Sequence, residues 1–228
     1  MMKVYKYRYG LERDLKTLES MKLFAPTSDK LNDPCEGVFI DEIVSDKGNS
    51  LHPYFKQGFK RFYEENKNIG IYSLSKTPID ELLWAYYANS HKGFCIEYDL
   101  EELLKINDLK THFDVNYGDI NKLNFGTAFV NNSIEKLLKL ILGNKSNVWR
   151  HEDEIRLLTE SSGSKEISEE AITGIYFGLR MPECSDEDKV VSQNDIMFAL
   201  KNKNIKFYKM YLESDSYQLN FNEIESKY

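Results

Sequence analysis

Hydrophobic and polar residues follow two different spacings along the chain, and these predict a mixture of strands and helices. Alternation in steps of two, with many aromatic and β-branched residues, predicts strands over residues 4–9, 69–75, 93–98, 172–178 and 205–212. Apolar residues three and four positions apart predict helices over residues 11–20, 53–67, 80–89, 99–105, 128–142 and 186–201. Shorter extended segments are expected over residues 22–25, 113–117 and 155–158.

The order of these elements favours an α+β fold. Strands and helices do not alternate strictly, and no glycine-rich turn follows the first strand, which disfavours a doubly wound dinucleotide fold. We expect a mixed or antiparallel sheet core with helical insertions, built as one sheet or as two small packed sheets. No clear linker divides the chain, so we predict a single domain over residues 1–228, with residues 217–228 as a loose C-terminal tail.

Composition narrows the class of protein. Hydrophobic residues make up 41% of the chain, and 15 Tyr and 13 Phe can fill a core without disulfides. The net charge of −7 argues against nonspecific coating of nucleic acid, which needs a basic face. Three separated cysteines and four scattered histidines lack the spacing of a zinc site, so we predict no metal site and reduced thiols in a cytoplasmic protein. No apolar run is long enough to span a membrane.

Candidate chemistry gathers in three short boxes. The first contains Asn32, Asp33, Pro34, Cys35 and Glu36. Proline fixes its own φ and restricts the residue before it, so this box predicts a sharp turn. The two carboxylates of the turn would then project as substrate-binding or supporting groups. Alternatively, the aspartate bonds only to backbone amides of its own turn.

The second box combines a strand, a helix and the turn that follows the helix. Ser73 and Ser75 share one face of the predicted strand, because side chains alternate along a strand. Trp84 and Tyr87 are three residues apart and share a helix face, which either stacks against a planar ring or packs into the core. His91 follows the helix and either caps its carbonyls or contacts a ligand phosphate or takes part in proton transfer.

The third box covers residues 149–156 and places charged groups directly before an apolar strand. If the strand begins at Glu152, then Glu152, Glu154 and Arg156 point to the same side. Burying three charged groups is costly unless they are paired or functional, so this box is a candidate site. The alternative is an exposed edge strand in which Glu154 and Arg156 are cross-strand partners.

Taken in order, the three boxes resemble a widespread bacterial and phage family of uncharacterised domains that are often described as related to abortive infection. The resemblance covers roughly residues 5–178 and rests on Asn-Asp-Pro-x-Glu, Trp-x-x-Tyr and Trp-x-x-Glu-x-Glu-x-Arg. Cys35 stands where the family pattern usually has Phe. The resemblance implies a role in phage defence.

A more distant resemblance implies a mechanism. Arg8, Ser73-x-Ser75 and Glu152-x-Glu154 follow the motif order of arginine-type ADP-ribosyltransferases, which bind NAD in a cleft between two small antiparallel sheets. This resemblance implies that Arg8 holds an NAD phosphate, that Ser73 orients the catalytic glutamate and that Ser75 braces the sheet. Glu154 would bond the ribose hydroxyl and stabilise an oxocarbenium-like transition state, while Glu152 would help to activate the acceptor.

The same resemblance implies that Tyr87 or Trp84 stacks on the nicotinamide. The acceptor stays open among protein, nucleic acid and small molecule.

Two other classes of function also stay open. A nuclease would gather Asp33, Glu36, Glu152 and Glu154 around Mg²⁺, although Arg156 then stands near the strand carboxylates where such enzymes usually place lysine. A non-enzymatic module would use the aromatic and polar boxes to bind a nucleotide or a partner protein without turnover.

Overall fold

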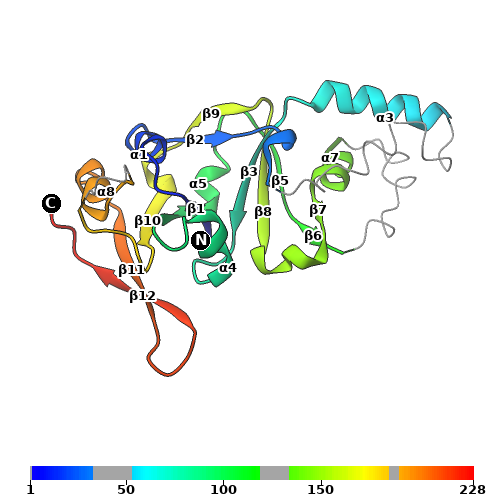
Figure 1. The fold of residues 1–228 in the computed structure, drawn as a ribbon. Helices are drawn as coiled ribbons and strands as arrows, with labels where there is room; N and C mark the ends of the chain where they lie inside the picture. The colour runs from blue at the N-terminus through cyan, green and yellow to red at the C-terminus, as the bar shows by residue number, and fades with distance from the viewer. Residues whose placement is uncertain (1, 33–52, 119–133, 185–189) are drawn as a thin grey trace.

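A computed structural model describes residues 2–32, 53–118, 134–184 and 190–228 and has the expected α+β architecture. Its main feature is one eight-stranded sheet, flanked by helices (Figure 1). Across the sheet the strand order is β12 (Leu219–Ile224), β11 (Lys206–Leu212), β10 (Ile172–Phe177), β4 (Phe94–Asp99), β1 (Lys3–Arg8), β3 (Gly70–Ser75), β8 (Glu154–Thr159) and β5 (Leu109–Asp114). Neighbours are antiparallel except for the parallel pair of β10 and β11.

Two small sheets of two strands each lie beside the main sheet. The antiparallel one pairs β2 (Lys22–Ala25) with β9 (Gly163–Glu166), and the parallel one pairs β6 (Asn116–Tyr117) with β7 (Asn144–Lys145). The second pair matters for the candidate site, because it holds residues before β8 close to that strand.

The helices bury the sheet from several directions. They are α1 (Glu12–Glu19), α3 (Pro53–Asn66), α4 (Glu81–Tyr87), α5 (Leu100–Leu103), α7 (Ile134–Leu142) and α8 (Gln193–Ala199), with short 3-10 turns η1 (Ser28–Lys30), η3 (Asn147–Glu152) and η4 (Glu169–Ala171). Side chains of α1, α5 and α8 join the largest core cluster, α4 packs into a second cluster and α7 into a third. Figure 1 shows α8 at one end of the molecule and α3 and α7 at the other.

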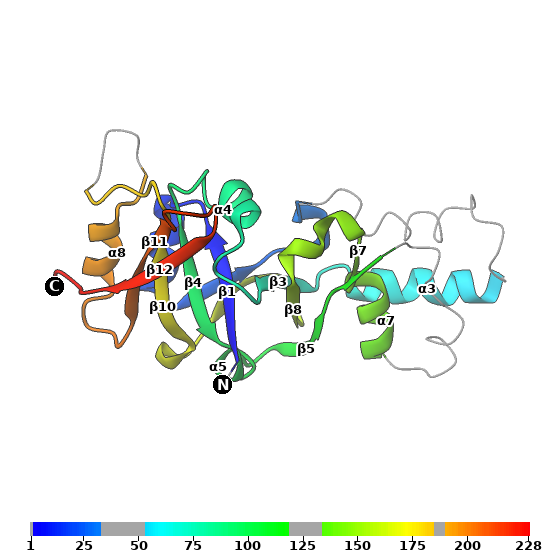
Figure 2. The same ribbon diagram turned by 90° about the horizontal axis from the view of Figure 1, so that it is seen from below.

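The main sheet nearly divides between β1 and β3. Six consecutive residues of β1 pair with β4, whereas β1 and β3 pair only where Tyr5 lies opposite Ser75. In Figure 2, β10, β4 and β1 lie on one side of this junction and β8 and β5 on the other. The junction leaves residues 70–74 of β3 without a register partner in β1, so side chains of β1 can reach this edge.

The prediction of a loose C-terminal tail over residues 217–228 is wrong for the part that forms β12. Residues of β12 pair with β11 at six positions, and Leu219 is only 5% exposed. The alternation along this strand is weak because the strand lies at the edge of the sheet, and its other side chains are half-buried or exposed. The sequence pattern therefore gave little indication of β12, although this strand is part of the main sheet.

The last predicted helix is shorter than expected. It begins after Ser192, whose hydroxyl accepts from the Asp195 amide while the Asp195 side chain accepts from the Ser192 amide. This reciprocal capping sets the start of α8 well after residue 186.

Candidate functional site

The third box changes direction at Asp153. The 3-10 turn η3 ends at Glu152, Asp153 adopts a left-handed conformation with φ of 40°, and β8 begins at Glu154. Glu152 therefore does not belong to the strand, and the expectation that three charged residues alternate along one strand is wrong. The turn nevertheless brings both glutamates to a common cation, Lys145.

Glu154 and Arg156 form a buried ion pair. They are two residues apart on β8 and so share one face. Arg156 Nε lies 2.7 Å from Glu154 Oε1 and its Nη2 lies 3.1 Å from Oε2, while the two residues are 1% and 5% exposed. The interpretation as an exposed edge strand is wrong, because β8 lies between β3 and β5.

Lys145 bridges the two glutamates from β7. Its ammonium lies 2.5 Å from Glu152 Oε2 and 3.6 Å from Glu154 Oε2, and it sits 4.8 Å from the centre of the Trp149 ring. The Tyr87 hydroxyl donates to Glu152 Oε1 at 2.7 Å. Both carboxylates are thus held by donors on separate segments of the chain.

Neighbouring groups keep Glu154 ionised. Burial raises the pKa of this carboxyl, but the charge and hydrogen bonds of Arg156, the charge of Lys145 and a hydrogen bond from the Ser73 hydroxyl outweigh burial and lower the pKa to about 2. The Tyr117 hydroxyl accepts from the Glu154 backbone amide at 2.8 Å. Ser73 lies directly across from Arg156 on the paired strand β3, which explains its reach to the carboxylate.

Two cations of β1 lie at the junction. The Lys6 ammonium donates to the Ser73 carbonyl oxygen at 2.7 Å, and Arg8 Nη2 lies 3.3 Å from the Tyr72 hydroxyl. Burial, followed by the positive charge of Arg8, lowers the pKa of Lys6 to about 7. The carboxylates of the cluster act on Lys6 in the opposite direction, so the groups from β1 and β8 influence one another electrostatically.

The two aromatic residues of α4 have different roles. Trp84 is 0% exposed, donates its indole N–H to the Pro78 carbonyl at 2.7 Å and packs edge-on against Tyr7. The suggestion that Trp84 stacks on a ligand is therefore wrong, because the ring is enclosed in the core. Tyr87 is half-buried and joins the polar cluster through Glu152.

His91 and Ser75 act locally in the described structure. The His91 ring stacks on Trp84 with 6.0 Å between centroids, and its backbone amide donates to the Trp84 carbonyl. The helix end is thus bonded by the backbone of His91, while no contact described here joins its ring to the glutamates. Ser75 Oγ accepts from the Thr77 amide at 3.2 Å and supports the turn that leaves β3.

The first box is only partly described. Asp33 and Glu36 lie outside the described residues. Asn32, the residue before them, forms a side-chain hydrogen bond with the Tyr87 hydroxyl. The beginning of this box therefore reaches the same cluster as the third box.

Sequence reasoning missed Lys6, Tyr72, Tyr117 and Lys145. A signal existed for Lys6, because it lies two residues before Arg8 and so shares its side of the predicted strand. Lys145 offered none: it follows a helix as one lysine among many, and only the pairing of β6 with β7 sets it beside β8.

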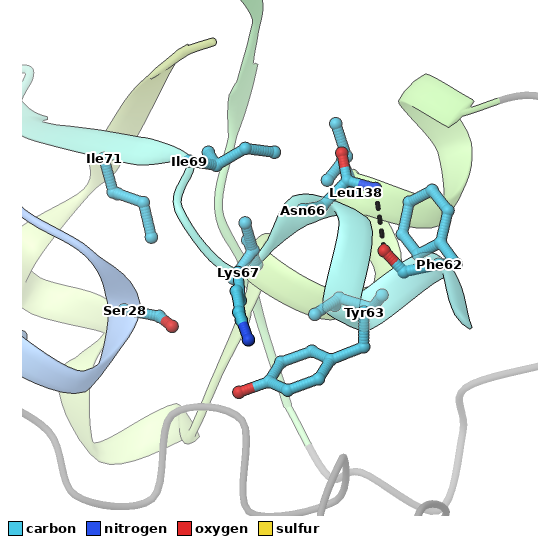
Figure 3. Close-up of a pocket in the computed structure, with 10 residues that line it drawn as sticks. Ser28, Phe62, Tyr63, Asn66, Lys67, Ile69, Ile71 and Leu138 are labelled. Carbon is cyan, nitrogen blue, oxygen red and sulfur yellow. Dashed lines mark hydrogen bonds between the residues drawn. The ribbon is translucent and has the colours of Figure 1, made fainter. Parts of the chain in front are cut away.

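A separate hollow of about 20 Å³ lies between α3, α7 and β3 (Figure 3). Its lining is mainly apolar and includes Phe62, Ile69, Ile71 and Leu138, with the Asn66 side chain donating to the Phe62 carbonyl at 2.8 Å. A space of this size fits about one water molecule and no nucleotide. None of the charged residues of the cluster lines it.

The family model described as "Protein of unknown function (DUF2971)" matches residues 83–157. The match runs from α4 into β8 and so contains Tyr87, Lys145, Glu152, Glu154 and Arg156. No curated protein and no solved structure matches the chain. None of the described helices combines the length and apolar character that crossing a bilayer would require.

Proposed function

We propose that the chain is an ADP-ribosyltransferase-like enzyme that uses NAD as substrate at the junction of β1, β3 and β8. The observation that carries the proposal is the hydrogen bond from Ser73 to Glu154 beside two cations of the neighbouring strand, Lys6 and Arg8. The motif order of that superfamily implies a serine that orients the glutamate and an arginine that holds a phosphate. The family resemblance further suggests a toxin or phage-defence effector as the biological role.

In the proposed reaction, the protein contributes mainly charged groups held in fixed positions. The bond between the ribose carbon and the nicotinamide nitrogen breaks, and its electron pair leaves with nicotinamide. The ribose then carries positive charge, which the Glu154 carboxylate stabilises where it develops. The acceptor nucleophile attacks that carbon and passes its proton to Glu152, which is held by Tyr87 and Lys145.

Substrate binding has to rearrange one contact. Both Glu154 oxygens accept from Arg156, at 2.7 Å and 3.1 Å. One oxygen must turn to the ribose hydroxyl, and the longer of the two hydrogen bonds is the natural one to exchange. Arg156 keeps its bond to the Leu142 carbonyl, which holds the guanidinium in place during the exchange.

The same ion pair favours a second candidate, a module that binds a nucleotide without turnover. A carboxylate with both oxygens engaged serves to hold the site together as well as to catalyse. In that case the cations of β1 bind the ligand and the glutamates act only as structural partners of Lys145 and Arg156.

A metal-dependent nuclease is the least supported class. The Lys145 ammonium lies between the two glutamates, where a divalent cation would have to sit to bind both. The charges of Lys145 and Arg156 together already balance those of the two carboxylates, so the described part of the site has little remaining attraction for Mg²⁺.

The test is release of nicotinamide from NAD by the purified protein, measured by chromatography with and without EDTA. We expect release that is independent of EDTA and reduced on the order of ten- to a hundredfold in Ser73→Ala, because one hydrogen bond to the charged catalytic group is lost. Ser164→Ala is the matched control, since this serine is also on a strand but is exposed. NAD binding with no release would select the second candidate, and nucleic-acid cleavage that EDTA stops would select the nuclease.

Expression supplies an independent readout of the biological role. If the protein is a toxin, its production should slow growth of the host, and Ser73→Ala should relieve this effect while accumulating to the same level. If hosts that produce the wild type, Ser73→Ala or Ser164→Ala all grow at the same rate, toxicity through this site is refuted.

A further inference from the structure

Lys6 and Arg8 are neighbouring cations that form no ion pair with any residue the structure describes. They are two residues apart on β1 and project to the same side of the strand. Within the described residues neither forms an ion pair at 4.0 Å or less, and their hydrogen bonds go to the Ser73 carbonyl and the Tyr72 hydroxyl. Lys145 and Arg156, in contrast, are each paired with a glutamate.

The Tyr72 ring holds the two cations together. The Lys6 ammonium lies 5.0 Å from the ring centre and the Arg8 guanidinium carbon 5.8 Å from it. The ring itself is fixed, because Tyr72 is buried and its hydroxyl lies 3.0 Å from that of Tyr98. Cation–π contacts offset only part of the cost of placing two like charges side by side away from water.

Among the described residues, the charge balance of the cluster points to an anionic ligand. Within the described residues, Lys6, Lys145 and Arg156 interact with the carboxylates of Glu152 and Glu154, and Arg8 lies close enough to Lys6 to act on its charge. Asp14 adds a more distant negative charge on the side of Arg8. Among these described groups, the two cations of β1 therefore add positive charge beyond the ion pairs that Lys145 and Arg156 form with the glutamates.

We propose that Lys6 is a ligand-contacting residue that, together with Arg8, binds the diphosphate group of a nucleotide at the junction of β1 and β3. The proposal rests on the proposed function for the placement of the ligand and adds the residue and the chemical group that it recognises. Arginine offers a planar fork to phosphate oxygens, whereas lysine offers a compact charge on a flexible stem that can leave the Ser73 carbonyl for the ligand. A diphosphate carries enough negative charge to match these two cations.

Binding should depend on pH through Lys6. The groups that face Lys6 are Arg8 and Arg156, which disfavour its proton, and Glu152 and Glu154, which favour it. Since only the protonated amine attracts phosphate, affinity should fall as pH rises through about 7, the pKa of Lys6 in the free protein. A bound diphosphate raises that pKa, so the affinity should go on falling until the pH reaches the higher pKa of Lys6 in the complex.

The experiment is calorimetric titration of the full chain with inorganic pyrophosphate and with ADP-ribose, at pH 6 and pH 8.5. Lys6→Met removes the charge and keeps the length of the side chain. We expect it to weaken binding of both ligands about ten- to a hundredfold at pH 6, the usual effect of one charge-assisted hydrogen bond. It should also abolish the loss of affinity at the higher pH. Lys16→Met is the control, because it removes the same charge from an exposed lysine of α1 and should leave both affinities unchanged.

The outcomes separate this inference from the proposed function. If the protein binds pyrophosphate through Lys6 and yet releases no nicotinamide from NAD, the inference about Lys6 is supported and the proposed enzyme activity is refuted. If the wild type releases nicotinamide and Lys6→Met binds both ligands with unchanged affinity, the inference about Lys6 is overturned and the proposed enzyme activity is supported. Stronger competition by a DNA oligonucleotide than by ADP-ribose would also overturn it, since the site would then favour a polymer backbone. Thermal unfolding of Lys6→Met should match the wild type or exceed it, because the variant removes a charge that is costly to bury.

Discussion

Glu154→Gln should destabilise the folded protein by roughly 3–5 kcal/mol, because it removes the negative charge to which two nitrogens of the buried Arg156 guanidinium donate. The lowered pKa of Glu154, to which Arg156, Lys145 and Ser73 all contribute, indicates stabilisation in the same direction. A value of about 2 in place of the ordinary 4.5 corresponds to roughly 3 kcal/mol in favour of the ionised folded state. We therefore expect this carboxylate to contribute to folding as well as to the proposed chemistry.

Urea unfolding followed by tryptophan fluorescence measures the effect, with Glu160→Gln as the control. Glu160 follows β8 directly, and its ion pair with Lys110 is largely exposed on the glutamate side. Removing that charge should cost less than about 1 kcal/mol. The double variant Glu154→Leu with Arg156→Met removes both charges at similar volume and should recover most of the lost stability without recovering activity.

The pH dependence provides the refuting result. Since folding lowers the pKa of Glu154, its contribution is fully present above about pH 4.5 and is lost as pH falls toward 2. Wild-type stability should therefore decline over this range more steeply than that of the double variant. A cost below about 1 kcal/mol for Glu154→Gln, or parallel pH profiles for the two proteins, would show that the ion pair is not closed in the folded protein.

Three further predictions concern the neighbours of the two glutamates, the helix α4 and the C-terminal strand. Lys145→Met should destabilise the protein by about 3 kcal/mol or more, measured by urea unfolding, because two buried glutamates lose their common cation. Tyr87→Phe should slow nicotinamide release with little change in unfolding temperature, whereas Trp84→Phe should lower the unfolding temperature and leave the affinity for ADP-ribose unchanged. Deletion of residues 217–228 should expose the edge of β11 and cause concentration-dependent association in sedimentation experiments, because Leu219 and its strand no longer cover it.

Local patterns in the sequence determined most of the secondary structure. Three patterns each produced the element that they predicted: the aromatic alternation of the first strand, the run of apolar residues in β8 and the three-residue spacing of Trp84 and Tyr87 in α4. The third box was recognisable as a candidate site for a physical reason. Charged residues next to an apolar strand need partners, and Glu154 and Arg156 satisfy one another.

The tertiary structure alone decided which residues form the site. Lys145 reaches the glutamates because β7 pairs with β6, and Lys6 reaches Ser73 because β1 and β3 separate after one paired position. Trp84 and Tyr87 share a helix pattern, yet only the surroundings of α4 enclose the first and direct the second to Glu152. Short-range periodicity fixes which way a side chain points from its own element, while the partners that it meets come from segments far along the chain.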